Sequence, residues 1–352
     1  MAKEYGFAVI GLGIGMHHCA AIEQAKGARL AAVCDHDPER LAEAMKKHGC
    51  HGYSDWKDLL ADPGIDCVNI TVESGKHAEF GVSAAKAGKH IIVEKPVDIS
   101  PSRVKRLRDA VTKAGVKAAC VFQSRMDPLN IALKKAIDKG RLGKLIGVHG
   151  HLPWYRAQEY YEGPHGAWKG TWELDGGGSL MNQGVHTVDL LQWLAGPVEE
   201  VAGFCGVHAH DIETEDQTVA VLRFANGALG TLLTTTCAEP GQDSRIYVYG
   251  DKGSFSRLGD QLEFYEAGPP KERKRLLERF GAPAQGAAVS SDPMAVPHDG
   301  HRLIVEDMAR ALRNDREPAI TLEAGTHAVE IACAIYKANK TGRTVKIASV
   351  RK

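Results

Sequence analysis

The feature that most constrains this chain is the segment AVIGLGIGMHH, which joins an apolar run near the N-terminus to a helical pattern. Gly11 and Gly13 permit the tight turn and close backbone approach that a pyrophosphate requires, and Ile14 and Gly15 open a helix whose first N–H groups can bind an anion. The third glycine of the pattern GxGxxG is absent, because Met16 occupies its place and Gly15 comes one residue early. The segment predicts a dinucleotide site, with a plain strand–turn–helix corner as the alternative.

An acidic residue ends the second apolar run. Asp35 lies 24 residues after Gly11, where a carboxylate hydrogen-bonds the adenosine ribose of a bound dinucleotide. A carboxylate at this position repels the 2′-phosphate of NADP, so we expect NAD as the cofactor. His36 and Arg40 lie close enough in the sequence to leave NADP open as the alternative.

Short apolar runs alternate with amphipathic stretches through the first 120 residues. The predicted strands are 7–10, 30–34, 67–71, 90–93 and 117–122, and the predicted helices are 17–26, 38–47, 76–87 and 100–113. This alternation is typical of βαβ units and a parallel sheet. We therefore expect an α/β protein whose N-terminal Rossmann domain spans residues 1–123.

The rhythm of the sequence changes after this point. We expect helices at 128–139, 183–194, 301–313 and 323–339, and strands at 145–151, 218–224, 230–236, 245–249, 262–265 and 344–347. The strand-like runs from 198 to 264 are separated by turn signals such as Asn226-Gly227. These features predict a second, α+β domain over residues 124–352 with a mostly antiparallel sheet; the late helices belong to it or pack back on the first domain.

Two further expectations concern this second domain. Residues 266–300 are rich in Pro, Gly and Ala around the basic, helix-like piece KERKRLLERF, and we interpret them as an insertion loop or lid. The late helices can cover only one face of the predicted sheet, and the charged piece suits a solvated lid better than a cover. A large apolar face left in water favours a partner subunit, so we expect a homodimer or homotetramer.

Composition excludes several classes of protein. Lys and Arg together number 44, as do Asp and Glu, so there is no general attraction to nucleic acid or anionic membrane. The apolar stretches are shorter than a membrane span, and the N-terminus runs straight into a strand without room for a signal peptide. The eight cysteines are scattered and include no CxxC pair. We therefore expect reduced thiols and a cytoplasmic protein.

The run HIIVEKPV ends the fourth long strand of the first domain. Residues at the carboxyl ends of strands in open α/β sheets face the ligand crevice, so Lys95 is a candidate general acid or base. A cis peptide before Pro96 would aim this lysine. The alternative is a surface lysine in a loop.

A richer cluster lies between residues 168 and 196. Gly176, Gly177 and Gly178 allow the backbone to approach a ligand or another strand closely. Asn182, His186 and Asp189 follow at i, i+4 and i+7, which places them on one face of an α-helix. A lone histidine on such a face is usually structural. One that follows a triple glycine and pairs with Asn182 is a catalytic candidate.

Aromatic and basic residues precede this cluster. Tyr155 and Arg156, with Tyr160 and Tyr161, are interpreted as the lining of a sugar pocket, because aromatic faces pack on pyranose C–H surfaces and Arg binds hydroxyls or phosphate. The pairs His149/His151 and His208/His210 have a spacing that could bind a metal ion. Without a third clustered ligand we interpret them as polar strand residues, and we expect no metal site.

At this point the chain resembles the Gfo/Idh/MocA oxidoreductases. The resemblance covers essentially the whole sequence and rests on GLGIG, SGKHAE at 74–79, AGKHIIVEKP at 87–96, GRLGKL at 140–145 and GGGSLMNQGVHTVDLL at 176–191. It implies a Rossmann domain followed by an α+β domain whose open-faced sheet is used for oligomerisation. The segments WYRAQEYY, WKGTW and MNQGVH are most similar to the branch with nucleotide-sugar 3-dehydrogenases.

The resemblance also implies roles for particular residues. Lys95 and His186 match the family's catalytic lysine and histidine, and Asn182 stands where many members carry aspartate. The residues that the resemblance adds to the cofactor site are Ser74, His77, Glu94, Trp168 and Lys169. The usual Thr-Pro before Ser74 is replaced by Val72-Glu73.

These observations predict an NAD-dependent dehydrogenase of a secondary alcohol on a sugar, glycoside or nucleotide sugar, acting at C3. The substrate hydroxyl would lie between Lys95 and His186, with Tyr155, Arg156 and Asn182 as further substrate contacts, while hydride passes to nicotinamide C4. The alternatives are an inositol dehydrogenase and an NAD-dependent glycoside hydrolase that uses transient oxidation at C3. A non-enzymatic sugar sensor is disfavoured, because such a protein would be expected to lose the lysine or the histidine.

Overall fold

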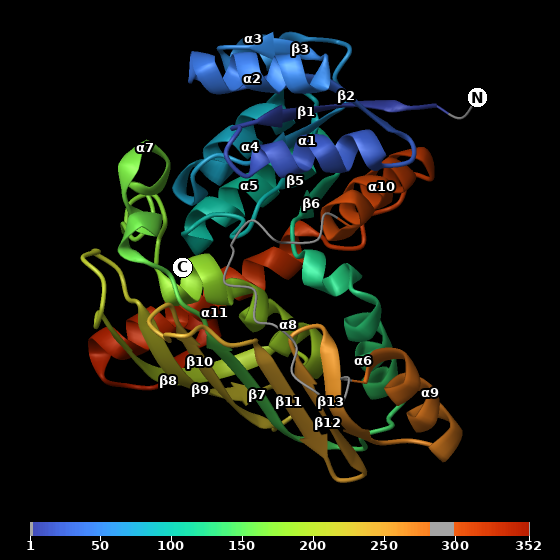
Figure 1. The fold of residues 1–352 in the computed structure, drawn as a ribbon, viewed down its shortest axis with the longest axis vertical. Coiled ribbons are helices and arrows are strands. Elements are labelled where there is room, and N and C mark those ends of the chain that lie inside the picture. The colour runs from blue at the N-terminus through green and yellow to red at the C-terminus, as the bar shows by residue number, and fades with distance from the viewer. Residues whose placement is uncertain (1–2, 282–298, 352) are drawn as a thin grey trace. The chain divides into compact units, whose positions relative to one another are not determined.

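The computed structural model of the chain describes residues 3–281 and 299–351 (Figure 1). The chain divides into two compact units. One comprises Met1–Met126 with Pro297–Thr326, and the other comprises Asp127–Val296 with His327–Lys352. No helix among the described residues is both long and apolar enough to cross a membrane.

The first unit is built on a six-stranded parallel sheet, as the sequence predicts. The order is β3-β2-β1-β4-β5-β6, with bounds β1 Tyr5–Ile10, β2 Ala28–Cys34, β3 His51–Tyr53, β4 Cys67–Ile70, β5 His90–Val93 and β6 Ala118–Cys120. The strand order reverses between β1 and β4. Ligands of open α/β sheets bind outside the carboxyl ends of the strands at such a reversal, which here lies beside the glycine-rich turn.

The helices of the first unit follow the strands in alternation. They are α1 Gly15–Gln24, α2 Pro38–His48, α3 Trp56–Ala61, α4 His77–Lys86, α5 Pro101–Ala114 and α10 Asp299–Arg313, with 3₁₀ turns η1 Ser74–Lys76 and η2 Gln123–Met126. The sequence explains both ends of α2. Asp37 accepts hydrogen bonds from two N–H groups of the first turn, and Pro38 is the first helical residue. Gly49 ends the helix with φ of 62°. The short β3 and α3 were not predicted.

The second unit contains an eight-stranded, mostly antiparallel sheet, which confirms the predicted fold class. The order is β13-β12-β11-β7-β10-β9-β8-β14, with bounds β7 Leu145–Pro153, β8 Val198–Gly206, β9 Gln217–Phe224, β10 Leu229–Thr235, β11 Arg245–Gly250, β12 Gly253–Leu258, β13 Gln261–Glu266 and β14 Val345–Lys346. Strands β7 and β10 form its one parallel pair among the described residues.

The two faces of this sheet differ in their surroundings. Along β9 burial alternates strictly, and α8 (Val185–Ala195) packs against β7 on the buried side. The other face exposes large apolar side chains: Phe204 on β8 is 78% exposed and lies opposite Val219 of β9, while Val221 and Leu229 are each 55% exposed. This exposed apolar face is what the expected partner subunit would cover.

The remaining helical segments of the second unit are α6 Pro128–Asp138, η3 Gln158–Tyr161, α7 Gly163–Gly166, α9 Pro270–Phe280, η5 Ile347–Val350 and most of α11, Leu322–Thr341. The sequence predicts one regular helix over 183–194, and this is wrong at its start. Residues Ser179–Gly184 form a π-helical segment, and the α-helix begins only at Val185.

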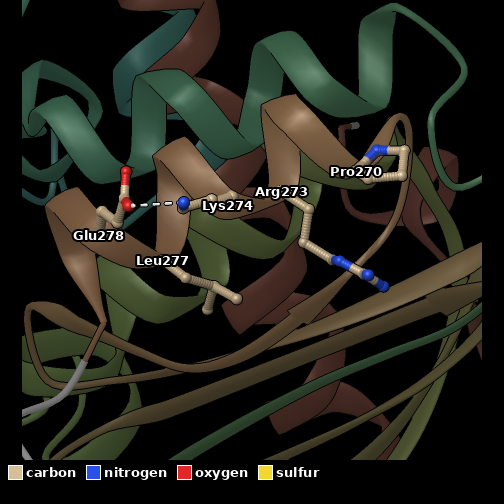
Figure 2. Close-up of a pocket in the computed structure, with 5 residues that line it drawn as sticks. All are labelled: Pro270, Arg273, Lys274, Leu277 and Glu278. Atoms are coloured by element: carbon tan, nitrogen blue, oxygen red, sulfur yellow. Dashed lines mark ion pairs between the residues drawn. The ribbon is translucent and has the colours of Figure 1, made fainter.

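The helix-like piece expected within the 266–300 insertion is present. The basic piece is a full helix, α9, which lies against β13 and buries Leu276. Figure 2 shows its outer side, where Arg273, Lys274, Leu277 and Glu278 line a shallow surface pocket with Pro270 and the Lys274 ammonium lies 3.7 Å from the Glu278 carboxylate. The rest of the expected lid, residues 282–298, lies outside the described residues.

Candidate active site

The glycine-rich turn between β1 and α1 has the geometry that its sequence predicts. Gly11 has φ of 93°, and a Cβ on it would lie 2.8 Å from the carbonyl oxygen of Thr71. A Cβ on Gly15 would lie 2.7 Å from Thr71 Oγ1 and 2.8 Å from a methyl group of Val9, whereas Gly13 has open space around its Cα. Gly15 therefore supplies the close helix–strand packing of the third glycine, one residue early.

The N-terminus of α1 fits a pyrophosphate. No side chain caps the helix at Ile14, and the first turn carries no acidic residue. Ile14 itself is 38% exposed. Because the backbone N–H groups and the helix dipole attract an anion, Gly13, Ile14 and Gly15 are suited to hold the phosphates of a dinucleotide.

Asp35 follows β2 directly and is almost fully buried. One carboxylate oxygen accepts a hydrogen bond of 2.7 Å from the N–H of Leu12, and the other accepts one of 2.9 Å from the N–H of Asp37. The carboxylate thus ties the glycine-rich turn to the end of β2, and each oxygen retains a second lone pair that a ribose hydroxyl can use. The ring of His36 lies 3.2 Å from the same carboxylate and is exposed.

Glu94 and Lys95 follow β5 in a turn whose Lys95–Pro96 peptide is cis, as expected. The Glu94 carboxylate accepts hydrogen bonds from the N–H of Lys95 over 2.9 Å and from Nε2 of His18 over 2.9 Å. His301 Nε2 lies 3.5 Å from the same carboxylate. Burial opposes ionisation of Glu94, but the hydrogen bonds from the two histidines hold its pKa well below its usual range.

Ser74 and His77 are both buried at the start of α4. The two ring nitrogens of His77 lie 2.7 Å from the carbonyl oxygen of Pro96 and 3.0 Å from that of Val72. Burial lowers the pKa of His77. The side chain therefore joins the cis-proline turn to the end of β4, and its contact with the cofactor stays a prediction.

In the second unit the triple glycine makes close approaches, as its sequence predicts. A Cβ on Gly177 would lie 1.9 Å from the hydroxyl of Tyr336, and one on Gly178 would lie 2.1 Å from the carbonyl oxygen of Glu215. The Glu215 carboxylate accepts hydrogen bonds from the N–H groups of Gly178 and Leu180, over 3.2 Å and 2.8 Å. Burial raises the pKa of Glu215 to about 7.

The triple glycine leads into the π-helical segment, where Asn182 and Gln183 are buried. Asn182 Nδ2 donates to Asp175 over 2.6 Å, and Gln183 Nε2 donates to Asn182 Oδ1 over 2.7 Å. The predicted i, i+4, i+7 face fails at Asn182, because that spacing presumes α-helical geometry. His186, which is half-buried, and the buried Asp189 do lie together on α8.

Arg156 and its neighbours lie next to this segment. The guanidinium is 8% exposed, donates to Gln183 Oε1 over 3.2 Å and stacks 5.1 Å from the ring of Trp154. Lys169 Nζ lies 3.8 Å above the ring of Tyr160. Arg156, Asn182 and Lys169 are thus brought into one neighbourhood. Tyr155 pairs with Cys237 in an isolated bridge, and Trp168 is half-buried.

Two clusters of possible metal ligands occur among the described residues, and the sequence analysis found neither. One is His18, Glu94 and His301, and the other is His210, Asp216 and Cys237. His210 and His208 lie in the loop after β8 and not on a strand, which corrects the earlier interpretation. His149 and His151 do lie on strand β7, so the interpretation as polar strand residues holds for that pair.

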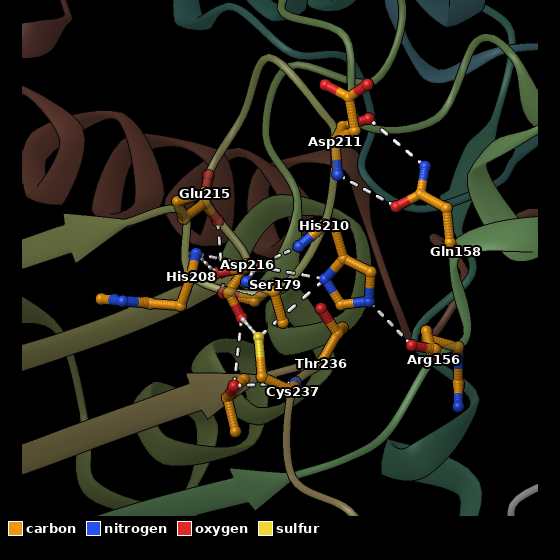
Figure 3. A network of polar contacts seen from close by, with 12 residues as sticks. Arg156, Gln158, Ser179, His208, His210, Asp211, Glu215, Asp216, Thr236 and Cys237 are labelled. Atoms are coloured by element: carbon orange, nitrogen blue, oxygen red, sulfur yellow. Dashed lines mark hydrogen bonds and ion pairs between the residues drawn. The ribbon is translucent and has the colours of Figure 1, made fainter.

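The second cluster is shown in Figure 3. Asp216 accepts hydrogen bonds from the N–H groups of His208, Ala209 and His210, as well as from the ring of His210 over 3.1 Å. Burial raises the pKa of the Cys237 thiol to about 11. The cluster is explained as a capped loop, and the expected lack of a metal site stays a prediction.

Sequence reasoning missed the buried carboxylates that organise the site. Asp175 and Glu215 are fully or almost fully buried, and they hold the segments around the triple glycine. The available sequence signal for Asp175 is its position directly before the three glycines. His18 could have been suspected from its place on α1, three residues after Gly15.

Comparison with known proteins agrees with this geometry. Residues 5–122 match the oxidoreductase family with an NAD-binding Rossmann fold, and residues 131–256 match the GFO/IDH/MocA C-terminal domain. The crystal structure of the WlbA dehydrogenase from Bordetella pertussis in complex with NADH and UDP-GlcNAcA is similar over 98% of this chain and 99% of that one, with a TM-score of 0.86 and 32% identity.

Two curated relatives are inositol dehydrogenases. Myo-inositol 2-dehydrogenase from Thermotoga maritima is 32% identical over 70% of this chain and 72% of its own length. The scyllo-inositol 2-dehydrogenase (NAD(+)) of Bacillus subtilis is 26% identical over 99% of this chain and 97% of its own.

The parallel sheet, the glycine-rich turn and Asp35 together define an NAD-dependent oxidoreductase. With both of its domains matched, the chain belongs to the Gfo/Idh/MocA family.

Proposed function

We propose that the protein oxidises or reduces a secondary alcohol of a sugar, glycoside or nucleotide sugar at C3. The observation that carries this proposal is a buried hydrogen-bond network in the second unit, which links Arg156, Gln183 and Asn182 beside the triple glycine. Polar groups of this kind supply directional contacts to the hydroxyl groups of a pyranose. The aromatic rings of Trp154 and Tyr160 beside Arg156 supply apolar surface.

Lys95 and His186 are proposed to exchange the proton of the reacting hydroxyl. The nicotinamide, when bound, accepts or returns hydride at C4. Lys95 is held by its own N–H, which donates to the ionised Glu94, and by the cis peptide to Pro96. His186 is held on the rigid helix α8. General acid–base catalysis by such groups contributes about 10²–10⁴-fold to a rate.

The similarity to inositol dehydrogenases supports a second candidate, a cyclitol as the substrate. The deciding experiment is an assay of NADH formation on a panel of pyranosides, nucleotide sugars and inositols. We expect the highest kcat/KM with a nucleotide sugar, accompanied by a keto product at C3. Turnover of inositols alone would replace the proposed substrate class. Release of free aglycone without net NADH would instead identify a glycoside hydrolase.

We also propose that the protein works in the cytoplasm as a homodimer or homotetramer. The support for assembly is the apolar face that the eight-stranded sheet turns to solvent. On it Phe204 is paired with Val219, and Val221 is paired with Thr231. Burying such a face against a second copy removes it from water.

A further inference from the structure

We propose that Asp175 is a positioning residue of the reaction, because it fixes the amide of Asn182 in one orientation and excludes a carboxylate from that position. The kinetic part of this inference rests on the proposed function. The structural part rests only on contacts within the second unit.

Four side chains form one hydrogen-bonded chain. Asn182 Nδ2 donates to Asp175 Oδ1 over 2.6 Å, Gln183 Nε2 donates to Asn182 Oδ1 over 2.7 Å, and Arg156 Nη2 donates to Gln183 Oε1 over 3.2 Å. Asp175 Oδ2 accepts the N–H of Gly170 over 2.8 Å. All four side chains are at least nine-tenths buried.

The direction of every bond in this chain is fixed by its two ends. A guanidinium can only donate, so Gln183 must present its oxygen to Arg156 and its nitrogen to Asn182. At the other end, the amide nitrogen of Asn182 can only donate, and it donates to Asp175 Oδ1. The hydroxyl of Tyr160 accepts a further hydrogen bond of 2.8 Å from Gln183 Nε2. A rotated amide at either position would set two donors or two acceptors against each other.

A negative charge at position 182 is therefore incompatible with Asp175. A carboxylate at position 182 would lie in hydrogen-bond contact with that of Asp175, in a buried site. Two carboxylates this close cannot both ionise, so they share a proton and one pKa rises strongly. Exchanging the two residues avoids the conflict. In the exchanged pair, Asn at 175 still accepts the N–H of Gly170 and donates to Asp at 182, which still accepts from Gln183.

The test compares Asn182→Asp, Asp175→Asn and the double variant Asp175→Asn/Asn182→Asp with the wild type. Thermal unfolding is followed between pH 5 and pH 9, without substrate. A shared proton means a pKa raised in the folded state, so the stability of Asn182→Asp is highest at low pH and falls as the proton is lost with rising pH. We expect the melting temperature of Asn182→Asp to fall with rising pH more steeply than that of the wild type, and the double variant to show the wild-type pH dependence.

The matched control is Asp189→Asn in the Asn182→Asp background. Asp189 is another fully buried carboxylate, on the following helix and seven residues after Asn182. Its removal should not restore the wild-type pH dependence. An Asn182→Asp variant that follows the wild type, or equal rescue by Asp175→Asn and Asp189→Asn, would overturn the proposal.

The kinetic readout separates positioning from mere stability. The kcat of Asn182→Asp should fall about tenfold for each pH unit above the raised pKa, whereas the double variant should lack this fall. A kcat that is independent of pH in a folded Asn182→Asp variant would remove Asp175 from the reaction. If the wild type turned over no sugar or cyclitol, the proposed function would fail, while the unfolding curves would still decide the pairing.

Discussion

The hydroxyl of Tyr336 donates a hydrogen bond of 3.1 Å to Glu215 Oε1, and the same hydroxyl accepts the N–H of Met181 over 3.2 Å. Burial raises the pKa of Tyr336 well above its usual range, so the phenol stays protonated. These contacts tie the end of the triple glycine to α11 within the second unit. Burial raises the pKa of the Glu215 carboxyl to about 7.

Stability should depend on pH through Glu215. Its folded pKa of about 7 lies above that of an unfolded glutamate, so its proton stabilises the fold at low pH and is lost as pH rises from about 4.3 to 7. We expect the free energy of unfolding to fall over this window in the wild type and to fall less in Glu215→Gln. Urea unfolding at successive pH values measures it. Glu199→Gln, at an exposed glutamate, is the control, and identical curves for wild type and Glu215→Gln would contradict the prediction.

Removing either of the proposed proton-transfer groups should lower turnover without unfolding the chain. Lys95→Ala and His186→Ala should each lower kcat by about 10²–10⁴-fold, the usual contribution of general acid–base catalysis. His186 belongs to the second unit, so NADH binding, followed by fluorescence, should be unchanged in His186→Ala. Near-normal turnover in both variants would exclude them from the mechanism.

The choice of cofactor should depend on Asp35. Replacing it with serine removes the charge that repels a 2′-phosphate, so Asp35→Ser should weaken NAD and reduce discrimination against NADP. The same change removes an acceptor from the Leu12 N–H, and part of the loss in NAD affinity will come from the turn itself. Asp35→Asn keeps that acceptor and separates the two effects. A wild type that prefers NADP would contradict the assignment.

Placing a charge on the apolar face of the eight-stranded sheet should dissociate the proposed homo-oligomer. Val221 is 55% exposed near the middle of that face, and Val221→Lys places an ammonium where a partner subunit would bury it. Sedimentation velocity at micromolar concentration should show a dimer or tetramer for the wild type and a smaller species for the variant. Lys139→Glu, at an exposed helix end, is the control. A wild type that sediments at 38.0 kDa would show that no partner covers the face.

The fold could be predicted because the sequence has a regular hydrophobic periodicity. The strands of the first unit are continuous apolar runs because both faces are buried, and the helices between them begin and end at residues such as Asp37 and Gly49 that fix their own termini. The short β3 and α3 lack this signal. The piece KERKRLLERF has a helix-like sequence, and Leu276 is the buried residue of the resulting helix α9.

Only the site residues that belong to a recognisable sequence motif could be predicted. Gly11, Gly15, Asp35 and the turn of Lys95 lie where their motifs place them. Glu215 could not be found this way, because it lies 35 residues after Leu180 and accepts the N–H of that residue only through tertiary packing. The π-helical segment could not be found either, since hydrophobic spacing does not distinguish a wide turn from an α-helical one.

The π-helical segment at Ser179–Gly184 makes the length of this stretch, as well as its composition, a determinant of activity. A π turn accommodates one more residue than an α turn, so deleting a single residue here would let an ordinary helix run through from the glycines to Ala195. Asn182 would then rotate by about 100° around the helix axis relative to His186, since an α-helix has 3.6 residues per turn. The side chains of Asn182 and His186 would both remain, but their orientation relative to each other would change.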